Sequence, residues 1–451
     1  MQQRDAIDFG KANVAKLFVQ LFVPTVLGLL FSALLNLADG IFVGRGVSSD
    51  ALAAVNIAAP VFMICTGLSL MFGSGVSVVA AIHLSHGNVK AADINVTQAI
   101  TLSMTLMLIA SIVVMLFPAL TAQLFGGSPR LVPLSVEYLT YVTPGMVFSV
   151  LLIVGLFVLR LDGAPNYAMA AEILASLLNI GLDYLMVFPL QMGIKGAAIA
   201  TTISQVVGAT LVAIYLWRFS DKLHLYRPKF TRTSLRLTAR NAGYMIKLGF
   251  PNLLGEMAIC CTMIVGNYSF ISRLHEDGVA AFSVACYLLP LIFMFGSAIA
   301  QSSLPIVSYN YGLGHHHRVV LTLRISVVAA IVCGLATSAT GILLSQPIID
   351  LFLDGSPAAC TIAETGFPYY AFGFVFIGLN LVLIGYCQSV KRSCKATIYM
   401  LLRGFVFVIP CFILLPRLLG DKGLWLAVPV AEGLTLVTIL LTFARRPHSL
   451  V

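Results

Sequence analysis

The sequence predicts an all-α polytopic membrane protein with twelve transmembrane helices in two six-helix bundles, related by a parallel pseudo-twofold repeat. Three observations predict this fold class. Of the 451 residues, 59% are hydrophobic and only 10% are charged, with a mean hydropathy of +0.97, whereas soluble domains carry about 25% charged residues. Apolar runs of membrane-spanning length recur along the whole chain, and three sequence anchors repeat at one fixed offset.

The apolar runs reach the roughly 20 residues that a helix needs to cross the hydrocarbon core. They lie near residues 17–43, 52–82, 95–117, 134–158, 166–188, 194–216, 244–272, 279–308, 319–343, 365–388, 396–415 and 423–443. The first run has no small-residue cleavage site after it, so we expect it to stay as a helix and not to be removed as a signal peptide. Nine scattered cysteines form no CxxC pair and are expected to be small buried hydrophobes.

Proline residues inside these runs mark expected helix bends. Pro24 lies in the first run and Pro251 in the seventh, and Pro60 and Pro144 interrupt two others. Membrane helices tolerate such residues where neighbouring groups satisfy the freed backbone atoms. We therefore expect helix bends at Pro24 and Pro251.

Basic residues predict the orientation. Of the 27 Lys and Arg residues, 20 fall on the side of the N-terminus, six fall on the opposite side, and Arg403 lies within a helix. Because cytoplasmic loops carry an excess of Lys and Arg, both termini are expected to be cytoplasmic. Eight of the 20 lie between Arg218 and Lys247; a positive-inside linker explains them more simply than a nucleic-acid patch. Residues 233–241 of this linker suit an interfacial amphipathic helix.

The chain is expected to consist of an N-terminal six-helix lobe (1–217), a basic cytoplasmic linker (218–243) and a C-terminal six-helix lobe (244–451). Positions 227 residues apart repeat between the lobes: Pro24 matches Pro251, Asp50 matches Asp277, and Gly193 matches Gly420. Six helices per half place both halves in the membrane the same way up. Parallel repeats of this kind build a central cavity between two bundles, which is a transporter design.

Three polar residues stand at membrane depth in the first half only. Asn179 and Asp183 are four residues apart and so share one helical face, and Asp39 lies near the end of the first run. A carboxylate at the bilayer centre costs roughly 2.5–3.5 kcal/mol on insertion scales. The matching second-half positions hold Gly266, Val406 and Pro410. Since the second half folds without the cluster, function explains it better than packing does.

These residues predict an ion-coupling site. Two carboxylates close together in a low dielectric favour sharing a proton, which suits proton uptake and release. Their oxygens, with the Asn179 carbonyl and the Thr201 hydroxyl, also suit a hard cation such as Na⁺. The alternatives are acids that reach the interface from helix ends and a Thr201 hydroxyl bonded to its own helix. Asn36, three residues before Asp39, is expected to line the same cavity.

In the second half, Glu256 follows Pro251 by five residues. We expect it to lie in the substrate pathway and attract cationic substrates; the alternative is pairing with a polar neighbour. Glu172 and Glu432 are also intramembrane acids with no assigned role, and Arg403 is expected to pair with one of these acids. The tract at His315 has no partner Cys or acid, so no metal site is expected there.

The chain has no Walker Gly-Lys-Ser/Thr motif, no nucleophile elbow and no HExxH motif. We therefore expect neither enzymatic activity nor ATP-driven transport by this chain alone. An ion gradient is left as the energy source, with H⁺ or Na⁺ as the coupling ion and no other cofactor.

Five motifs carry a family resemblance. NLADGIFVG (36–44), LLNIGLDY (177–184), GIKGAAIATTISQ (193–205), GFPNLLGE (249–256) and PIVSYNYG (305–312) resemble those of the MATE (multidrug and toxin extrusion) transporters, nearest to the bacterial MepA-like exporters. The resemblance covers nearly the whole chain. It implies two lobes in a V that export organic cations and amphiphilic drugs by alternating access, in antiport with H⁺ or Na⁺, from the bacterial inner (cytoplasmic) membrane.

The resemblance also implies residue roles. Acids at the Asp39 and Asp183 positions and Asn at the Asn179 position form the family's cation site. Thr at the Thr201 position contributes to it, and bending at the Pro24 position is linked to it. Glu256 matches the family's second-lobe acid. Some members carry another acid in the tenth helix, whereas residues 367–388 contain none, which favours the first-lobe site.

Two alternatives stay open at this point. A lipid-linked oligosaccharide flippase of the same superfamily needs a cationic cavity for pyrophosphate, while the intramembrane charges here are mostly acidic. A non-transport membrane protein is the second, but a membrane enzyme needs clustered catalytic residues, and the chain shows none. The sequence does not choose between H⁺ and Na⁺ or give the substrate range. A pathway within one chain implies that a monomer in the lipid bilayer suffices.

Overall fold

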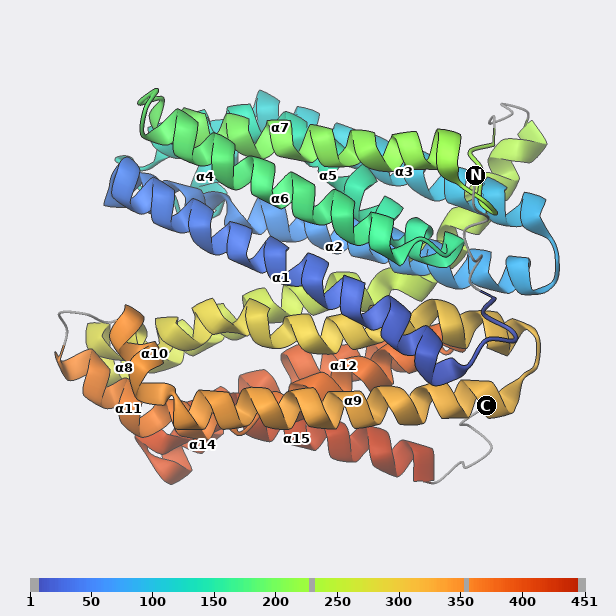
Figure 1. Cartoon of the computed structure of the whole chain (residues 1–451). Coiled ribbons are helices and arrows are strands. Elements are labelled where there is room, and N and C mark those ends of the chain that lie inside the picture. The colour runs from blue at the N-terminus through green and yellow to red at the C-terminus, as the bar shows by residue number, and fades with distance from the viewer. Residues whose placement is uncertain (1–7, 227–231, 353–356, 445–451) are drawn as a thin grey trace. The chain divides into compact units, whose positions relative to one another are not determined.

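The computed structural model describes residues 8–226, 232–352 and 357–444, and every regular element in these ranges is helical (Figure 1). The helices are α1 Val14–Gly46, α2 Ser49–Ser85, α3 Val89–Leu116, α4 Pro118–Leu124, α5 Val132–Asp162, α6 Pro165–Val187, α7 Gly193–Ile214, α8 Arg232–Gly312, α9 His316–Leu343, α10 Ser345–Phe352, α11 Pro357–Ala371, α12 Phe374–Ser389, α13 Ser393–Leu401, α14 Val408–Leu419 and α15 Asp421–Ala444. Two π-helical turns, η1 Tyr215–Phe219 and η2 Leu402–Val406, follow α7 and α13.

Eleven helical spans within the described ranges are long and apolar enough to cross a membrane. One of them, Arg236–Gly312, holds both the seventh and the eighth predicted runs. Its backbone leaves the helical region at His275, where φ is 54° and ψ is −149°. All twelve predicted runs therefore fall on helical spans. The predicted all-α, multi-pass membrane fold is confirmed.

Side-chain caps fix where the first helices begin. The Asn13 side chain accepts from the backbone N–H of Ala15 over 2.9 Å at the start of α1. Ser48 and Asn88 cap α2 and α3 in the same way, each over 3.1 Å. These bonds satisfy N–H groups that have no partner within the helix. The polar residues between apolar runs thus set the helix boundaries.

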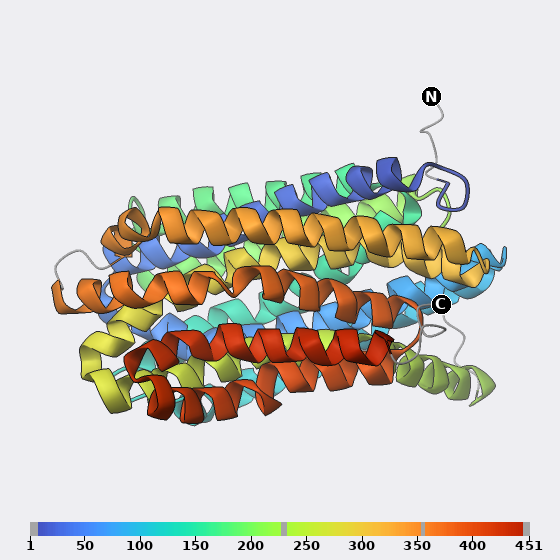
Figure 2. The same ribbon diagram turned by 90° about the horizontal axis from the view of Figure 1, so that it is seen from below.

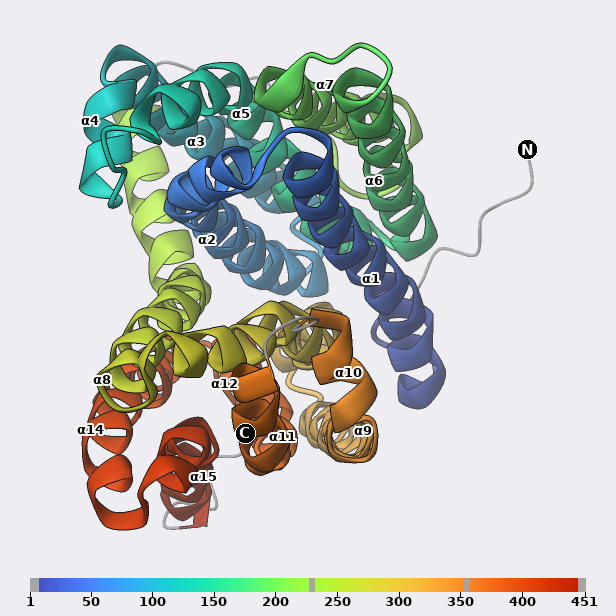
Figure 3. The ribbon, with the colours of Figure 1, turned by 90° about the vertical axis from the view of Figure 1, so that its left-hand side faces the viewer.

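The chain divides into two compact units, Met1–Leu253 (unit 1) and Leu254–Val451 (unit 2), and α8 contributes to both. In unit 1, α1 packs on α6, α6 on α7, and α7 on α5, which also contacts α2 and α3 (Figure 3). In unit 2, α9 packs on α12, and α15 packs on α11, α12 and α14 (Figure 2). The fourth membrane span of each unit, α5 and then α11 with α12, is its most buried span. Each unit therefore has the same span at its centre.

The beginning of α8 is fixed tightly to α2 within unit 1. A Cβ atom added at Gly249 would overlap the Met71 carbonyl, and one at Gly75 would overlap the Met245 carbonyl. Only glycine permits two helix backbones to come this close. Residues 233–241, expected as an interfacial helix, are helical and form the first turns of α8.

The start of the basic linker is held by one buried acid at the end of α5. The Asp162 carboxylate accepts from the Tyr215 hydroxyl over 2.7 Å. It also accepts from the backbone N–H groups of Asp221, Lys222 and Leu223, over 3.1, 2.9 and 2.9 Å. Residues 221–223 are therefore tied to α5.

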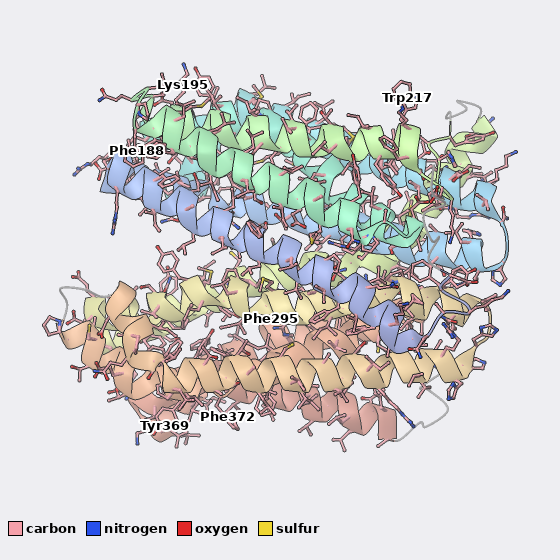
Figure 4. The ribbon with its side chains drawn as sticks, viewed as in Figure 1. Phe188, Lys195, Trp217, Phe295, Tyr369 and Phe372 are labelled. Atoms are coloured by element: carbon pink, nitrogen blue, oxygen red, sulfur yellow. The ribbon has the colours of Figure 1, made fainter. Side chains whose placement is uncertain are left out.

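The repeat is visible at corresponding helix ends. Gly193 begins α7 with φ 62°, and Gly420 precedes α15 with φ 63°, a left-handed region open to glycine. Two residues later, Lys195 Nζ lies 4.6 Å from the Tyr141 ring centroid, and Lys422 Nζ lies 5.7 Å from that of Tyr369. Figure 4 labels Lys195 and Tyr369. Both units thus keep the same glycine and the same lysine–tyrosine contact.

Candidate functional site

Three residues predicted for the coupling site meet where α6 packs on α7. The Asn179 amide is oriented so that Nδ2 donates to Asp183 Oδ2 over 3.0 Å and Oδ1 accepts from the Thr201 backbone N–H over 3.1 Å. The reverse orientation offers only a 3.4 Å contact from Nδ2 to Thr201 Oγ1. We choose the first orientation because it satisfies both ends of the amide. Asn179 therefore bridges an acid on its own helix to the next helix.

The two predicted acids both present an oxygen without a partner. Asp183 is fully buried, and its Oδ1 atom has no hydrogen bond; Oδ1 of Asp39, on α1, is also buried without one. Because α1 packs on α6, the two carboxylates lie within electrostatic range of each other. No Lys or Arg forms an ion pair with either acid in the described part of the chain. Two unpaired carboxylates in an apolar interior attract a proton or a cation.

The Thr201 hydroxyl donates to the carbonyl of Ala197 on its own helix, over 3.0 Å. This is the helix-bonded arrangement that the sequence left open. A hydroxyl has one donor and two acceptor lone pairs, so this bond leaves the oxygen able to accept. Thr201 can therefore still offer oxygen to a cation.

Tyr138 on α5 is a neighbour of this site that sequence reasoning missed. Its side chain is buried and lies within electrostatic range of both Asp39 and Asp183. Its ring packs 6.2 Å from that of Phe62. From sequence alone, a tyrosine in an apolar run looks like any other aromatic residue that packs in the interior. The only signal was its phenol group, which usually finds a polar partner when it is buried.

The other residues predicted for unit 1 lie on α1. Asn36 is exposed, one helical turn before the half-buried Asp39. Pro24 is buried within α1, which continues as helix on both sides of it. Because proline has no N–H, the carbonyl four residues earlier loses its helical hydrogen bond. The structure thus places Pro24 in the same helix as Asp39, whereas Asn179, Asp183 and Thr201 lie on α6 and α7.

A further acid lies close to α1. A Cβ atom added at Gly28 would stand 2.6 Å from Glu172 Oε2, so the carboxylate rests against the backbone of α1. Glu172 is in electrostatic contact with Arg160. Arg160 is buried near the end of α5, which extends beyond the apolar run predicted at residues 134–158. Glu172 therefore has a cationic neighbour, unlike Asp39 and Asp183.

In unit 2, Glu432 forms an ion pair with Arg403, whereas Glu256 has no such partner among the described residues. Arg403 Nη2 lies 2.7 Å from Glu432 Oε1, and Asn380 Nδ2 donates to Glu432 Oε2 over 2.6 Å. The guanidinium also lies 4.5 Å from the Phe293 ring centroid. Glu256 is partly buried on α8 and has no hydrogen bond or ion pair with any described residue. Of the three candidate acids, Glu432 is thus the partner of Arg403.

Pro251, the second proline predicted as a helix bend, lies buried within α8, in unit 1.

Comparison with known proteins gives one family. The family model MatE matches residues 24–185 and 255–413, one segment in each half. Multidrug export protein MepA of Staphylococcus aureus (strain MRSA252) is 23% identical over 450 residues, covering 99% of this chain and 97% of that protein. A FAD transporter of Shewanella oneidensis is 24% identical over 426 residues, covering 93% and 92%.

A solved structure shares the fold. It shows the outward-facing conformation of a multidrug resistance MATE family transporter of the MOP superfamily, with a TM-score of 0.91 and 23% identity, covering 100% of this chain and 99% of that one. The family match spans most of the chain and agrees with the motifs and the helical fold. The chain belongs to the MatE family, the multidrug and toxin extrusion transporters that its motifs resemble.

Proposed function

We propose that the protein is a secondary active multidrug exporter, which moves organic cations and amphiphilic drugs out of the cell in antiport with H⁺ or Na⁺. One observation carries the proposal. The Asp39 and Asp183 carboxylates each keep a buried oxygen without a hydrogen bond, and no ion pair with a described Lys or Arg neutralises them. Such acids are costly in a membrane unless they bind an ion. The export of multidrug substrates by MepA, by its name, supports the substrate class.

The coupling ion binds in unit 1 in this proposal. A proton would reside on the Asp39–Asp183 pair, with Asn179 holding Asp183 in place. A sodium ion would draw on the same carboxylates, on Asn179 Oδ1 and on Thr201 Oγ1, which are the oxygen ligands that hard cations prefer. In either case the bound ion compensates one of the two negative charges and relieves the repulsion between the acids, and ion release restores that repulsion. This change in charge would drive the switch between inward-facing and outward-facing states.

The bends and the substrate pathway complete the cycle. Pro24 lies in the same helix as Asp39, so a bend there would transmit ion binding along α1. Pro251 is its counterpart in α8. Glu256, which has no partner among the described residues, and Asn36, which is exposed, would line the substrate pathway. Glu256 would attract the cationic group of a drug.

We further propose a monomer in the bacterial inner (cytoplasmic) membrane with both termini cytoplasmic, because basic residues concentrate on that side. No cofactor besides the coupling ion enters the scheme.

The deciding experiment uses purified protein in liposomes loaded with ethidium. A proton gradient and a sodium gradient are imposed separately, with protein-free liposomes as the control. Dye movement under one gradient only would identify the coupling ion and support the exporter. If neither gradient moves dye, FAD and then a lipid-linked sugar become the next substrates to test, and movement of the latter would favour the flippase.

A further inference from the structure

Unit 1 contains a second polar site, remote from the acid cluster along the helices. A pocket of about 380 Å³ lies between the end of α2, the beginning of α3 and the first turns of α8. Its polar lining consists of His83, Asn95, Arg240, Asn241, Tyr244 and Lys247. No carboxylate lines it. The pocket is therefore positively charged and rich in hydrogen-bond donors.

The two cations of the pocket are available to a ligand. Arg240 and Lys247 are exposed, and neither forms a hydrogen bond or ion pair with any described residue. Asp93, the acid two residues before Asn95, instead accepts from the backbone N–H of His224 over 2.8 Å. The positive charge of the pocket is thus not cancelled from within unit 1.

The pocket walls are held in place. Gln98 on α3 accepts from Asn241 Nδ2 over 3.0 Å and donates to the Thr238 hydroxyl over 2.8 Å. The backbone contact between Gly75 and Met245 fixes the same stretch of α8 to α2. Arg240 and Lys247 therefore project from an anchored helix and not from a loose linker, which lowers the entropy cost of binding.

The location fits an anionic ligand at the membrane surface. Arg240 and Lys247 belong to the basic segment that the positive-inside rule assigns to the cytoplasmic side. Guanidinium groups bind phosphate through paired hydrogen bonds, and lysine adds a mobile point charge. Basic pockets on this side of membrane proteins suit lipid headgroups. We propose that this pocket binds a phosphate group, supplied by an anionic phospholipid headgroup or by free phosphate.

The test measures binding to the purified full chain in a neutral detergent. Dihexanoyl phosphatidylglycerol, dihexanoyl phosphatidylcholine and inorganic phosphate are titrated separately at low salt. We expect the phosphatidylglycerol to bind and the phosphatidylcholine to bind far more weakly. Binding of inorganic phosphate, in competition with the lipid, would assign the site to free phosphate; lipid binding without such competition would assign it to a headgroup.

Variants tie the binding to the pocket. Arg240→Gln and Lys247→Gln should each weaken phosphatidylglycerol binding about fivefold, the usual effect of one basic residue near an anionic surface. Arg236→Gln removes a cation one turn away on α8 that does not line the pocket, and it should bind as the unmodified protein does.

Three results would overturn the proposal: equal binding of both lipids, unchanged affinity in both pocket variants, or an equal loss in Arg236→Gln. Both single variants remove an exposed side chain, so they should fold; Arg240→Lys, which keeps the charge, should retain most binding.

Discussion

Arg403 and Glu432 form an ion pair in the interior of unit 2, with Nη2 and Oε1 2.7 Å apart and both side chains buried. Asp39 and Asp183 in unit 1 have no such cation among the described residues. The acid Glu432 is therefore neutralised by an ion pair, whereas Asp39 and Asp183 have no ion pair with any described residue. Each arrangement makes its own prediction.

Breaking the pair in unit 2 should destabilise the fold. Arg403→Met or Glu432→Leu alone leaves a buried charge unpaired and should cost about 3–5 kcal/mol. The double variant Arg403→Met/Glu432→Leu removes both charges and should recover most of the loss. Thermal unfolding in detergent measures this. Additive losses in the double variant would show that the two side chains act independently.

Neutralising Asp183 should abolish coupling without unfolding the protein. Asp183→Asn has nearly the same volume but cannot bind or release a proton, and it weakens cation binding. Gradient-driven ethidium export in liposomes should fall to the protein-free level. Asp50→Asn is the matched control, because Asp50 is a half-exposed acid paired with Arg130 at the surface. Normal export by Asp183→Asn would refute the coupling role.

Substitutions at Thr201 test whether the coupling ion is H⁺ or Na⁺. Thr201→Val keeps the shape but removes the oxygen, while Thr201→Ser keeps it. If the ion is Na⁺, Thr201→Val should raise the half-saturating sodium concentration several-fold and Thr201→Ser should not. Export rates at graded sodium concentrations give the answer. An equal response of the two variants would exclude the hydroxyl as a ligand.

Glu256→Gln should weaken export of cationic substrates more than that of neutral ones. Glu256 has no partner among the described residues, so its charge is free to act on a substrate. Parallel assays with a cationic and a neutral dye measure the difference. Equal loss for both dyes would indicate a structural role instead.

The close approach of α8 and α2 can be tested with two glycines of α8. Gly249→Ala would place a Cβ atom against the Met71 carbonyl and should destabilise by about 1–3 kcal/mol. Gly243→Ala meets no atom within 4 Å and should stabilise by about 0.4–1 kcal/mol. Melting temperatures of the two variants should therefore move in opposite directions. A similar shift in both would contradict the packing described.

The sequence predicts the helices well because hydropathy and helix length act locally. It also places Asn179 and Asp183 together, since four residues make one helical turn. It could not predict that Arg403 forms its ion pair with Glu432 and not with Glu172 or Glu256, because the pairing depends on how spans distant in the sequence pack. The position of Tyr138 near Asp39 and Asp183 could not be predicted for the same reason, because it arises from the packing of α5 within unit 1.

The contact of Lys195 with Tyr141 in unit 1 matches that of Lys422 with Tyr369 in unit 2. Both units have the same glycine and the same lysine–tyrosine contact at these helix ends, whereas the polar residues in their interiors differ. Matching helix ends of this kind allow the interiors of the two units to hold different polar residues. The same helix-end contacts thus accompany an interior with two unpaired acids, Asp39 and Asp183, in unit 1 and an interior crossed by the Arg403–Glu432 ion pair in unit 2.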